Sequence, residues 1–342
     1  MAIFCLSRDL NDLRNRLDNI LLGYKADGSE LLLSELGVTG SIIALLHDAL
    51  SPNLVQTISG NAAIIHGGPF ANIAHGCNSI IATKVGLSLA DYVVTEAGFG
   101  SDLGAEKFYD IKCRELGKKP ALTVLAATIR GLRNQMQAPA DNLDEGLNHL
   151  GRHIANIQGF GQHVVVVINR YADDADTDIA QVQQYCAQKD VACVVNTAFY
   201  DGAAGAEVVN EIAKNEATLH HAYNDDDALE EKVAKVVKNI YGGNEVIYST
   251  VAKKKLDQLQ QNEQYAHYPV CIAKTQYSFT DDPTKTGTPR GFDFHVRDVI
   301  LNRGAKFIVI IAGEVLRMPG LPKVPMATKI DVDAQGRIMG LS

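Results

Sequence analysis

The 342-residue sequence has no long apolar run, no excess of basic residues and no closely spaced cysteine pair. A membrane-spanning helix needs a run of about 18 apolar residues, and none occurs, so we expect no membrane insertion. A formal net charge of -8 argues against general nucleic-acid binding, because phosphates are neutralised by a basic excess. A local anion site is still compatible with this charge, since a few cations and a helix N-terminus suffice.

The six cysteines are scattered and form no CxxC motif. In a chain of this length, scattered thiols suit a reducing compartment better than a disulfide framework. The first ten residues contain an apolar stretch that is too short for a signal peptide and that ends at the charged Arg8 and Asp9. We therefore expect a cytoplasmic protein.

What is present is an ordinary globular composition, with 46% hydrophobic and 21% charged residues. The chain is long enough for two or three domains. In its first part, the leucine spacing over 8–22 predicts an amphipathic helix, and 30–36 and 41–50 are expected to be further helices. Short apolar runs at 53–57 and 62–65 predict buried strands.

The segment from 90 to 127 continues this alternation. Residues 90–95 predict a strand, and 121–127 predict a second, buried one. Between them, Asp102 is expected to cap a helix that runs to about Leu116, because a free carboxylate accepts first-turn N–H groups. Strands that alternate with helices imply a mainly parallel sheet.

The run Val164–Ile168 (VVVVI) is the strongest strand signal in the chain. A continuous β-branched run without alternation indicates burial on both faces, as in a central parallel strand. It follows a predicted helix at 144–158 and precedes a helix and a strand at 192–195, which makes a second βαβ unit. We therefore place a domain boundary near residue 157.

The C-terminal part differs, because proline and glycine separate its short predicted strands at 269–279, 291–301 and 306–315. Amphipathic helices are expected at 225–240 and 252–261 before it. The expected fold class is thus α/β, with mainly parallel sheets flanked by helices. It divides into a first domain, a second βαβ domain and a smaller mixed unit, at 1–157, 158–262 and 263–342.

Two glycine-rich loops are the most informative feature. The first, 66–78 (HGGPFANIAHGCN), follows a predicted strand, and the second, 96–102 (EAGFGSD), follows the predicted strand at 90–95. Long loops of special conformation at strand ends are where open α/β sheets bind ligands. The sequence therefore predicts a ligand site at this pair of loops.

Both loops resemble those of the formate–tetrahydrofolate ligase family, and the resemblance extends in the same order over essentially the whole chain. The other strings that carry it are Asn53–Thr57, Asp110–Arg114, Val167–Arg170, Ala273–Ser278 and Met318–Pro325.

The resemblance implies an ATP-dependent carbon–nitrogen ligase of one-carbon metabolism. Its substrates would be ATP, formate and tetrahydrofolate, and its products 10-formyltetrahydrofolate, ADP and phosphate, with formyl phosphate as intermediate. It also implies Mg with the ATP, a monovalent cation and a homo-oligomer. Residues 1–157 would be the remainder of a P-loop NTPase-like domain for nucleotide and formyl phosphate, and 158–262 would clamp a flat ring between aromatic side chains.

One departure from the family stands out. Its members carry a phosphate-binding P-loop in the front part of the chain, and GxxxxGK[ST] does not occur in these 342 residues. Met1–Leu6 instead resembles an internal stretch of the family's first domain. We therefore expect the chain to be inactive alone and to need a complementing N-terminal fragment, because the P-loop supplies the phosphate contacts. The alternatives are a non-catalytic remnant that binds folate or nucleotide, and one that only oligomerises.

In the second loop, the resemblance favours substrate or nucleotide binding by Glu96, Gly98, Phe99 and Gly100. Phe99 would offer a ring and exposed amides at a helix N-terminus; the alternative is a phenylalanine that plugs the core. Nearby charges either orient substrate or are solvated surface groups: Asp102, Lys107 and Arg130.

Asn169 and Tyr171 follow the 164–168 strand, and Phe199 follows the next one, so the two rings can face each other across a cleft. Family members place their aromatic clamp at these two ring positions, often as Phe and Trp, so both are substituted here. Any aromatic face can stack, which predicts that clamping is retained. The alternative is two ordinary loop aromatics.

In the first loop, the candidates are His66, Gly67, Gly68, His75 and Asn78. Together with the nearby cysteine, the two histidines raise a zinc hypothesis, because imidazole and thiolate are zinc ligands. No fourth ligand has zinc-site spacing, and the glycines favour backbone contact instead. We therefore expect no metal here, and histidines that bond within the loop.

Overall fold

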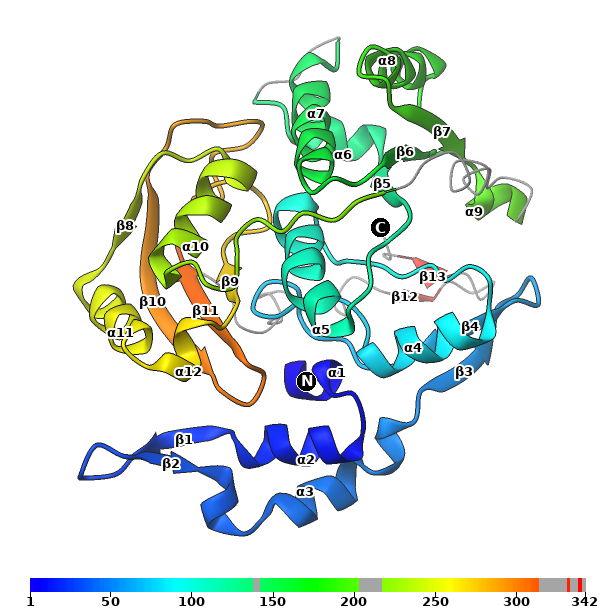
Figure 1. The fold of residues 1–342 in the computed structure, drawn as a ribbon. Coiled ribbons are helices and arrows are strands. Elements are labelled where there is room, and N and C mark those ends of the chain that lie inside the picture. Colours follow the sequence, from blue (N-terminus) through cyan, green and yellow to red (C-terminus); the bar gives the residue numbers. More distant parts are fainter. Residues whose placement is uncertain (138–141, 203–216, 314–330, 333–337, 340–342) are drawn as a thin grey trace.

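The structure is a computed structural model that describes residues 1–137, 142–202, 217–313, 331–332 and 338–339. Two larger sheets organise it, one on each side of a central helical segment over 101–116 (Figure 1). The string Met318–Pro325, which carries part of the family resemblance, lies outside the described residues. Within the described ranges, no helix has the length and apolar content to cross a membrane.

The C-terminal sheet has the strand order β8-β10-β11-β9. Its central pair is antiparallel, with Val296 opposite Ala312, whereas β9 runs parallel to β11 and β8 parallel to β10. This confirms the three strands predicted for the C-terminal part. The bounds are Val246–Tyr248 for β8, Val270–Ala273 for β9, Phe294–Asn302 for β10 and Phe307–Ala312 for β11.

Both faces of the β9–β11 half of this sheet are buried, because successive residues of these two strands enter two different cores. Ile272 and Ile310 pack with helices α10 and α11 on one face. Ala273 and Val309 pack with α1 and the central helical segment on the other. The helices are α1 (Ala2–Leu6), α10 (Leu229–Val236, continued by a π-helix over Val237–Tyr241), α11 (Thr250–Gln260) and α12 (Glu263–Ala266).

The second sheet is parallel, in the order β5-β6-β7, as predicted. Its central strand contains the VVVVI run, and all five of those residues are buried. Helices pack on one face around Leu150 and Val182. The elements are β5 (Thr123–Ala127), α6 (Ile129–Asn134), α7 (Asp144–Gly159), β6 (Val164–Asn169), α8 (Asp176–Ala187), β7 (Ala192–Asn196) and α9 (Ala198–Asp201).

Strand pairing crosses both of the expected domain boundaries. The pair β5–β6 spans residue 157, and the pair β8–β10 spans residue 262. Each of the two larger sheets thus takes strands from two of the expected domains. The division into three domains stays a proposal.

The N-terminal part is less helical than predicted. The helix expected over 8–22 is α2 (Leu10–Asp18), and Leu21 lies in strand β1 (Leu21–Tyr24) instead. The helix expected over 30–36 is strand β2 (Glu30–Leu32) followed by a 3-10 turn at Leu33–Leu36. A turn in which the Asp27 carboxylate accepts from the backbone and hydroxyl of Ser29 joins the strands, so local turn chemistry wins over helical periodicity.

The segment predicted as a helix over 41–50 is α3 (Thr39–Leu46) and a short 3-10 turn at Asp48–Leu50. The following strands β3 (Asn53–Gln56) and β4 (Ala62–Ile65) are present, but their predicted burial is wrong. They pair only with each other, as a hairpin that projects from the body (Figure 1), and Leu54 is 69% exposed.

The strand predicted at 90–95 is also wrong. After α4 (Ile80–Leu89) the chain continues without pairing to any strand of the described part, and Val94 is 90% exposed. Apolar composition alone predicted a strand here, but a strand needs a neighbour for its backbone groups. The remaining small sheet pairs β12 (Asp331–Val332) with β13 (Ile338–Met339).

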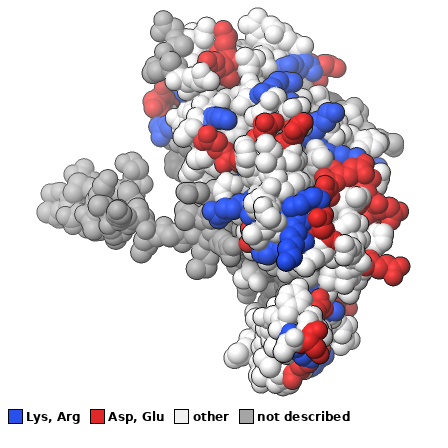
Figure 2. All heavy atoms as spheres, turned by 90° about the vertical axis from the view of Figure 1, so that its left-hand side faces the viewer, with Lys and Arg blue, Asp and Glu red and all other residues white. Residues whose placement is uncertain are grey.

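The face that carries β8, α10 and α11 mixes both signs of charge (Figure 2). Lys253 pairs with Glu230 and Asp257 there, and Lys255 pairs with Asp298 at 2.6 Å. Exposed pairs of this kind add little stability.

Candidate functional site

The two glycine-rich loops, 66–78 and 96–102, pack directly on each other, and we call them the loop pair. The Gly98 amide donates to the Gly76 carbonyl at 2.9 Å. Gly76 has φ of 61°, and a Cβ there would lie 2.2 Å from that of Ala71. Only glycine fits such a close approach with a left-handed backbone, so Gly76 lets the first loop fold tightly on itself. A Cβ on Gly98 would lie 3.0 Å from that of Ala71, so Gly98 serves the contact between the two loops.

Phe99 is held in an unusual conformation at the tip of the second loop. Its φ is 65°, in the left-handed region that costs a residue with a Cβ about 1–2 kcal/mol. Its ring is 47% exposed and lies edge-on to Phe70, with centroids 6.0 Å apart. The ring is therefore presented at the surface on a constrained backbone rather than used as a core plug.

Two buried lysines donate hydrogen bonds in and beside the first loop, one to its backbone and one to side chains. The Lys107 ammonium donates to the carbonyls of Ala71 at 2.6 Å and Asn72 at 2.9 Å. The Lys112 ammonium donates to the side chains of Asn78 at 2.6 Å and Thr83 at 2.9 Å. Lys107 is thus a structural cation of the loop pair, and Asn78 is oriented by a buried charge.

Asp102 does not cap the helix that follows it, so that prediction is wrong. Its carboxylate accepts from the Lys274 ammonium at 2.7 Å, and both side chains are buried. Burial alone would raise the pKa of Asp102, but the Lys274 charge, the nearby His153 and the hydrogen bonds to the carboxylate together outweigh burial and hold the pKa below its usual value. Lys274 also donates to the carbonyls of Thr275 and Ser278, so its role is to tie the C-terminal sheet to the second loop.

The segment after Asp102 is helical, as predicted, but partly in wider turns. It runs as π-helix over Ser101–Ala105 and Phe108–Cys113 and ends in α5 (Arg114–Leu116). Buried inside it, the Glu106 carboxylate finds no partner within the described residues, and burial raises its pKa well above the ordinary value. Burial therefore favours the protonated form of Glu106.

The two histidines of the first loop differ. His66 contacts the Ser79 hydroxyl through Nδ1 and the Ala49 carbonyl through Nε2, at 2.5 and 2.9 Å. His75 is fully buried with both ring nitrogens unpartnered among the described residues, and burial lowers its pKa to about 3. Burial also raises the pKa of the Cys77 thiol to about 12, so it is not a thiolate. The described residues contain no cluster of three or more metal-ligating side chains.

Gly67, Gly68 and Gly100 also belong to the loop pair. A Cβ on Gly67, whose φ is 69°, would lie 2.3 Å from Cys5 Sγ, whereas Gly68 faces open space. A Cβ on Gly100 would lie 2.7 Å from a ring carbon of His153. Glu96 is exposed at the start of the second loop.

A second group of candidates lies at the carboxyl ends of β6 and β7. The Asn196 amide donates to the Asn169 side chain at 2.8 Å and joins the two strand ends. Tyr171 is 43% exposed, with the Arg130 guanidinium 5.1 Å from its ring centre. Phe199 is 91% exposed.

The predicted clamp is not closed. Phe199 lies edge-on to Tyr200, with centroids 5.0 Å apart, and it makes no ring contact with Tyr171 in the described structure. Nor does any hydrogen bond or ion pair among the described residues join these aromatics to the loop pair. No contact among the described residues therefore links the two candidate groups directly.

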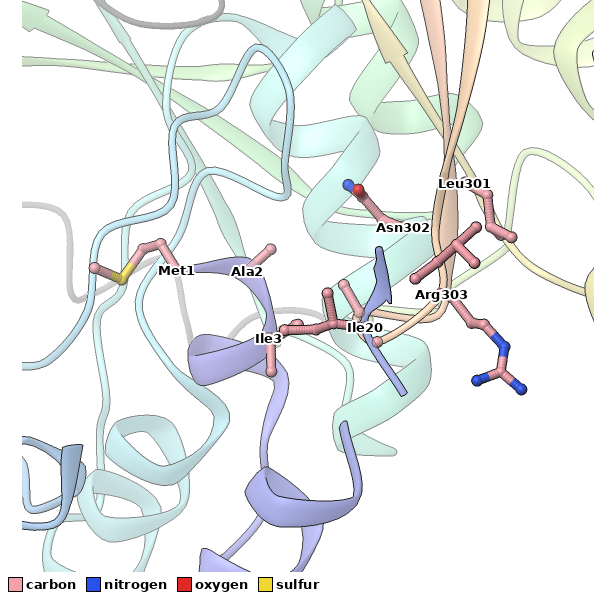
Figure 3. A pocket seen from close by; sticks show the side chains of 10 residues that line it. Met1, Ala2, Ile3, Ile20, Leu301, Asn302 and Arg303 are labelled. Atoms are coloured by element: carbon pink, nitrogen blue, oxygen red, sulfur yellow. The ribbon is translucent and has the colours of Figure 1, made fainter. Parts of the chain in front are cut away.

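Two cavities lie away from both groups. One of about 260 Å³ is lined by Met1–Ile3, Ile20–Leu21 and Leu301–Ala305, where the first helix meets the β10–β11 turn (Figure 3). The other, about 860 Å³, opens at the amino ends of β6 and β7 beside Gln162 and Asp190. Neither includes a residue of the loop pair.

Sequence reasoning missed four polar residues that hold the loop pair: Lys112, His149, His153 and Lys274. The two histidines stand four positions apart on the predicted helix at 144–158, and that spacing on one helical face was a visible signal. The lysines left no local signal, because their partners lie far along the chain.

Comparison with known proteins gives one consistent result. The family model described as formate–tetrahydrofolate ligase matches residues 1–342. Among curated proteins of that name, that of Bacteroides thetaiotaomicron is 49% identical, that of Porphyromonas gingivalis 50% and that of Methylorubrum populi 47%. Each alignment covers all of this chain and 64% of the relative, so the chain spans just under two thirds of their length. The chain belongs to the formate–tetrahydrofolate ligase family.

Proposed function

We propose that this chain takes part in joining formate to tetrahydrofolate, with the loop pair and the strand-end aromatics as its ligand-contacting surfaces. Family membership over the whole chain supports the reaction. The observation that carries the site is the exposed Phe99 ring on a backbone fixed between two packed loops. A strained residue that its surroundings over-determine is typical of ligand sites.

In the proposed reaction, ATP phosphorylates formate, and N10 of tetrahydrofolate then attacks the formyl phosphate and releases phosphate. The loop pair would bind the anionic intermediate through the backbone N–H groups of Phe99 and Gly100, ahead of the helical segment that begins at Ser101. Rigid loops would hold the formyl group for attack without moving.

Tyr171 and Phe199 would bind the flat pterin or adenine ring. Both are exposed at neighbouring strand ends, where Asn169, the last residue of β6, accepts from Asn196. Stacking on one ring contributes about 0.5–1.5 kcal/mol beyond area burial, so closure of the two rings on a ligand would be favourable.

Mg would arrive with ATP, and the described residues offer no group of three ligating side chains for it, so we derive no step through it. We likewise assign no residues to a monovalent cation. We keep as proposals the three-part division at 157 and 262, a homo-oligomer or a complementing N-terminal fragment, and a cytoplasmic location.

The alternative is a remnant that binds folate or nucleotide, or oligomerises, without catalysis. The absence of GxxxxGK[ST] from the 342 residues favours it for the isolated chain, since those residues would cradle the ATP phosphates. We therefore expect these 342 residues alone to bind tetrahydrofolate but to form no 10-formyltetrahydrofolate from ATP and formate.

Calorimetric titration with tetrahydrofolate, alongside an assay of ATP-dependent product, tests this. Phe199→Ala should weaken binding about tenfold, the equivalent of about 1.4 kcal/mol. Tyr24→Ala, which removes a ring that is 64% exposed in the N-terminal hairpin, is the matched control and should leave affinity unchanged. Unchanged affinity in Phe199→Ala would remove Phe199 from the site. Robust product from the chain alone would contradict the expected inactivity.

A further inference from the structure

An unbroken line of hydrogen bonds runs from the C-terminal part of the chain to the second glycine-rich loop through two histidines of α7. His149 Nδ1 lies 2.9 Å from the Gly287 carbonyl. The Nε2 atoms of His149 and His153 are 3.0 Å apart. His153 Nδ1 then lies 2.7 Å from the hydroxyl and 3.2 Å from the backbone nitrogen of Ser101.

Only one placement of protons satisfies every member of this line. A carbonyl only accepts, so His149 must carry its proton on Nδ1, and its Nε2 is then an acceptor. His153 must therefore donate from Nε2, which leaves its Nδ1 free to accept. That is what the Ser101 position needs, because its backbone N–H can only donate. The reverse assignment would set two donors against each other at Ser101 and two acceptors at Gly287.

The surroundings fix the rings as well as their protons. The Phe279 ring packs on both imidazoles, with centroids 5.1 Å from His149 and 4.9 Å from His153. Asn156 donates to the Ser101 hydroxyl at 3.1 Å, so the hydroxyl can in turn donate a hydrogen bond to His153 Nδ1. Gly100 leaves no room for a side chain beside the His153 ring.

This line meets the second loop two residues after Phe99. The loop is thus pinned on both sides of its strained residue, at Gly98 by the Gly76 carbonyl and at Ser101 by His153. Without the second pin, rotation at Phe99 out of the left-handed region would relieve strain.

We propose that His149 and His153 are positioning residues, which through one fixed pair of tautomers hold the Ser101 backbone and so keep Phe99 at its surface-presenting conformation. The effect on a bound ligand rests on the proposed function. The hold on the loop does not.

Protonation would break this hold. A proton added to His153 Nδ1 faces the Ser101 N–H, so the pin becomes a repulsion between donors. The charges that face His153 are Asp102, which favours protonation, and Lys274 and Arg152, which oppose it together with His149. Burial outweighs Asp102, and the pKa of His153 is lowered to about 4, so the pin persists at neutral pH.

The direct test is the proton on each ring in the unmodified 342-residue chain. Nitrogen-15 NMR of the histidine side chains at pH 7.5 should show the Nδ1–H tautomer for His149 and the Nε2–H tautomer for His153. The opposite tautomer at either ring, or a protonated ring, would overturn the proposal. This readout needs no ligand, so it stands or fails independently of the proposed function.

Hydrogen exchange of the Ser101 amide tests the pin itself. His153→Leu removes the acceptor and should speed exchange at least tenfold, whereas His153→Asn keeps an oxygen near the Nδ1 position and should restore most of the protection. His47→Asn, at an exposed histidine on the surface, is the control and should change nothing. Equal exchange in the wild type and His153→Leu would show that the imidazole does not hold the loop.

The consequence for ligand follows from the same variants. If tetrahydrofolate binds the wild-type chain, His153→Leu should weaken its affinity at least fivefold, with rescue by His153→Asn. Unchanged affinity in His153→Leu, with the Ser101 amide unprotected, would overturn the link to Phe99. If the wild type does not bind and the tautomers and exchange are as expected, the proposed function fails while the hold on the loop stands.

Discussion

The two main sheets of this chain are built from similar apolar strands but are covered very differently. In the C-terminal sheet the edge strand β9 is fully buried, and the Tyr223 hydroxyl accepts from the Val270 amide at 3.1 Å. The opposite edge strand β8 is partly open, with Ile247 43% exposed. In the β5–β6–β7 sheet only the central strand is buried, and Val124 on the edge strand β5 is 46% exposed.

This difference shows that burial belongs to the covering elements rather than to the strand. A β-branched run forms a strand in either place, but helices and loops from elsewhere decide whether its edges and faces are closed. The loop pair is one of the elements that close the C-terminal sheet, since Ala74 of the first loop packs in the core on one of its faces, next to Ile80 of α4. The candidate site is therefore anchored in the better-covered region.

The largest expected effect is on the ion pair that anchors the site there. Lys274→Met leaves the buried Asp102 carboxylate unpaired and should lower the free energy of unfolding by about 4 kcal/mol. The matched change in the other region is Arg170→Met, which removes an exposed pair with Asp176 and should cost less than about 1 kcal/mol. Urea denaturation measures both, and equal losses would contradict the contrast between the regions.

Acid should weaken the connection between the two regions, because His153 of α7 contacts the second loop. The pKa of this ring is lowered to about 4 in the folded chain and is about 6.5 when unfolded, so the unfolded state takes up the proton first. Stability is therefore present above pH 6.5 and is lost as the pH falls toward 4, by on the order of 3 kcal/mol.

His75 acts with the same sign, since its pKa is lowered to about 3. His149 has the same sign, because burial lowers its pKa too. The free energy of unfolding, measured by denaturation at pH values from 7.5 to 4.5, reports the combined contribution of these histidines. His153→Asn should flatten the curve by removing one of these buried histidines, whereas His47→Asn should leave its shape unchanged. A curve of the same steepness in His153→Asn would rule out His153 as a source of the pH dependence.

The smallest expected effects come from identical truncations on the two sheets. Val309→Ala on β11, where the side chain is 4% exposed, should cost about 2 kcal/mol, because buried methyl groups and their contacts are lost. Val124→Ala on β5 should cost less than about 0.5 kcal/mol, as for most exposed positions. Thermal denaturation compares the two, and a similar loss at Val124 would mean that the β5 edge is covered in solution.

The same comparison explains what could be predicted from the sequence. The VVVVI run and the C-terminal strands were predicted correctly, since their apolar composition and flanking glycines are local signals. Burial of β3 and β4 and a strand at 90–95 were predicted wrongly, because local composition does not say whether a covering element or a partner strand exists.

At the candidate site, the sequence identified the loops but not what holds them. The glycines marked close approach, and Phe99 is at the surface as the functional interpretation requires. Asp102 was predicted as a helix cap, because the rule for caps considers only nearby backbone. Its true partner, like the partner of His153, lies in another part of the chain.

The pairing of Asp102 with Lys274 spans 172 positions of the chain, and this separation orders events during synthesis. A polypeptide leaves the ribosome from its N-terminus, at about 5–20 residues per second. The second loop would therefore emerge many seconds before the lysine that neutralises its carboxylate. Until then the loop can be formed but not locked, and a nascent chain arrested before residue 274 should be cleaved readily by proteases next to Phe99.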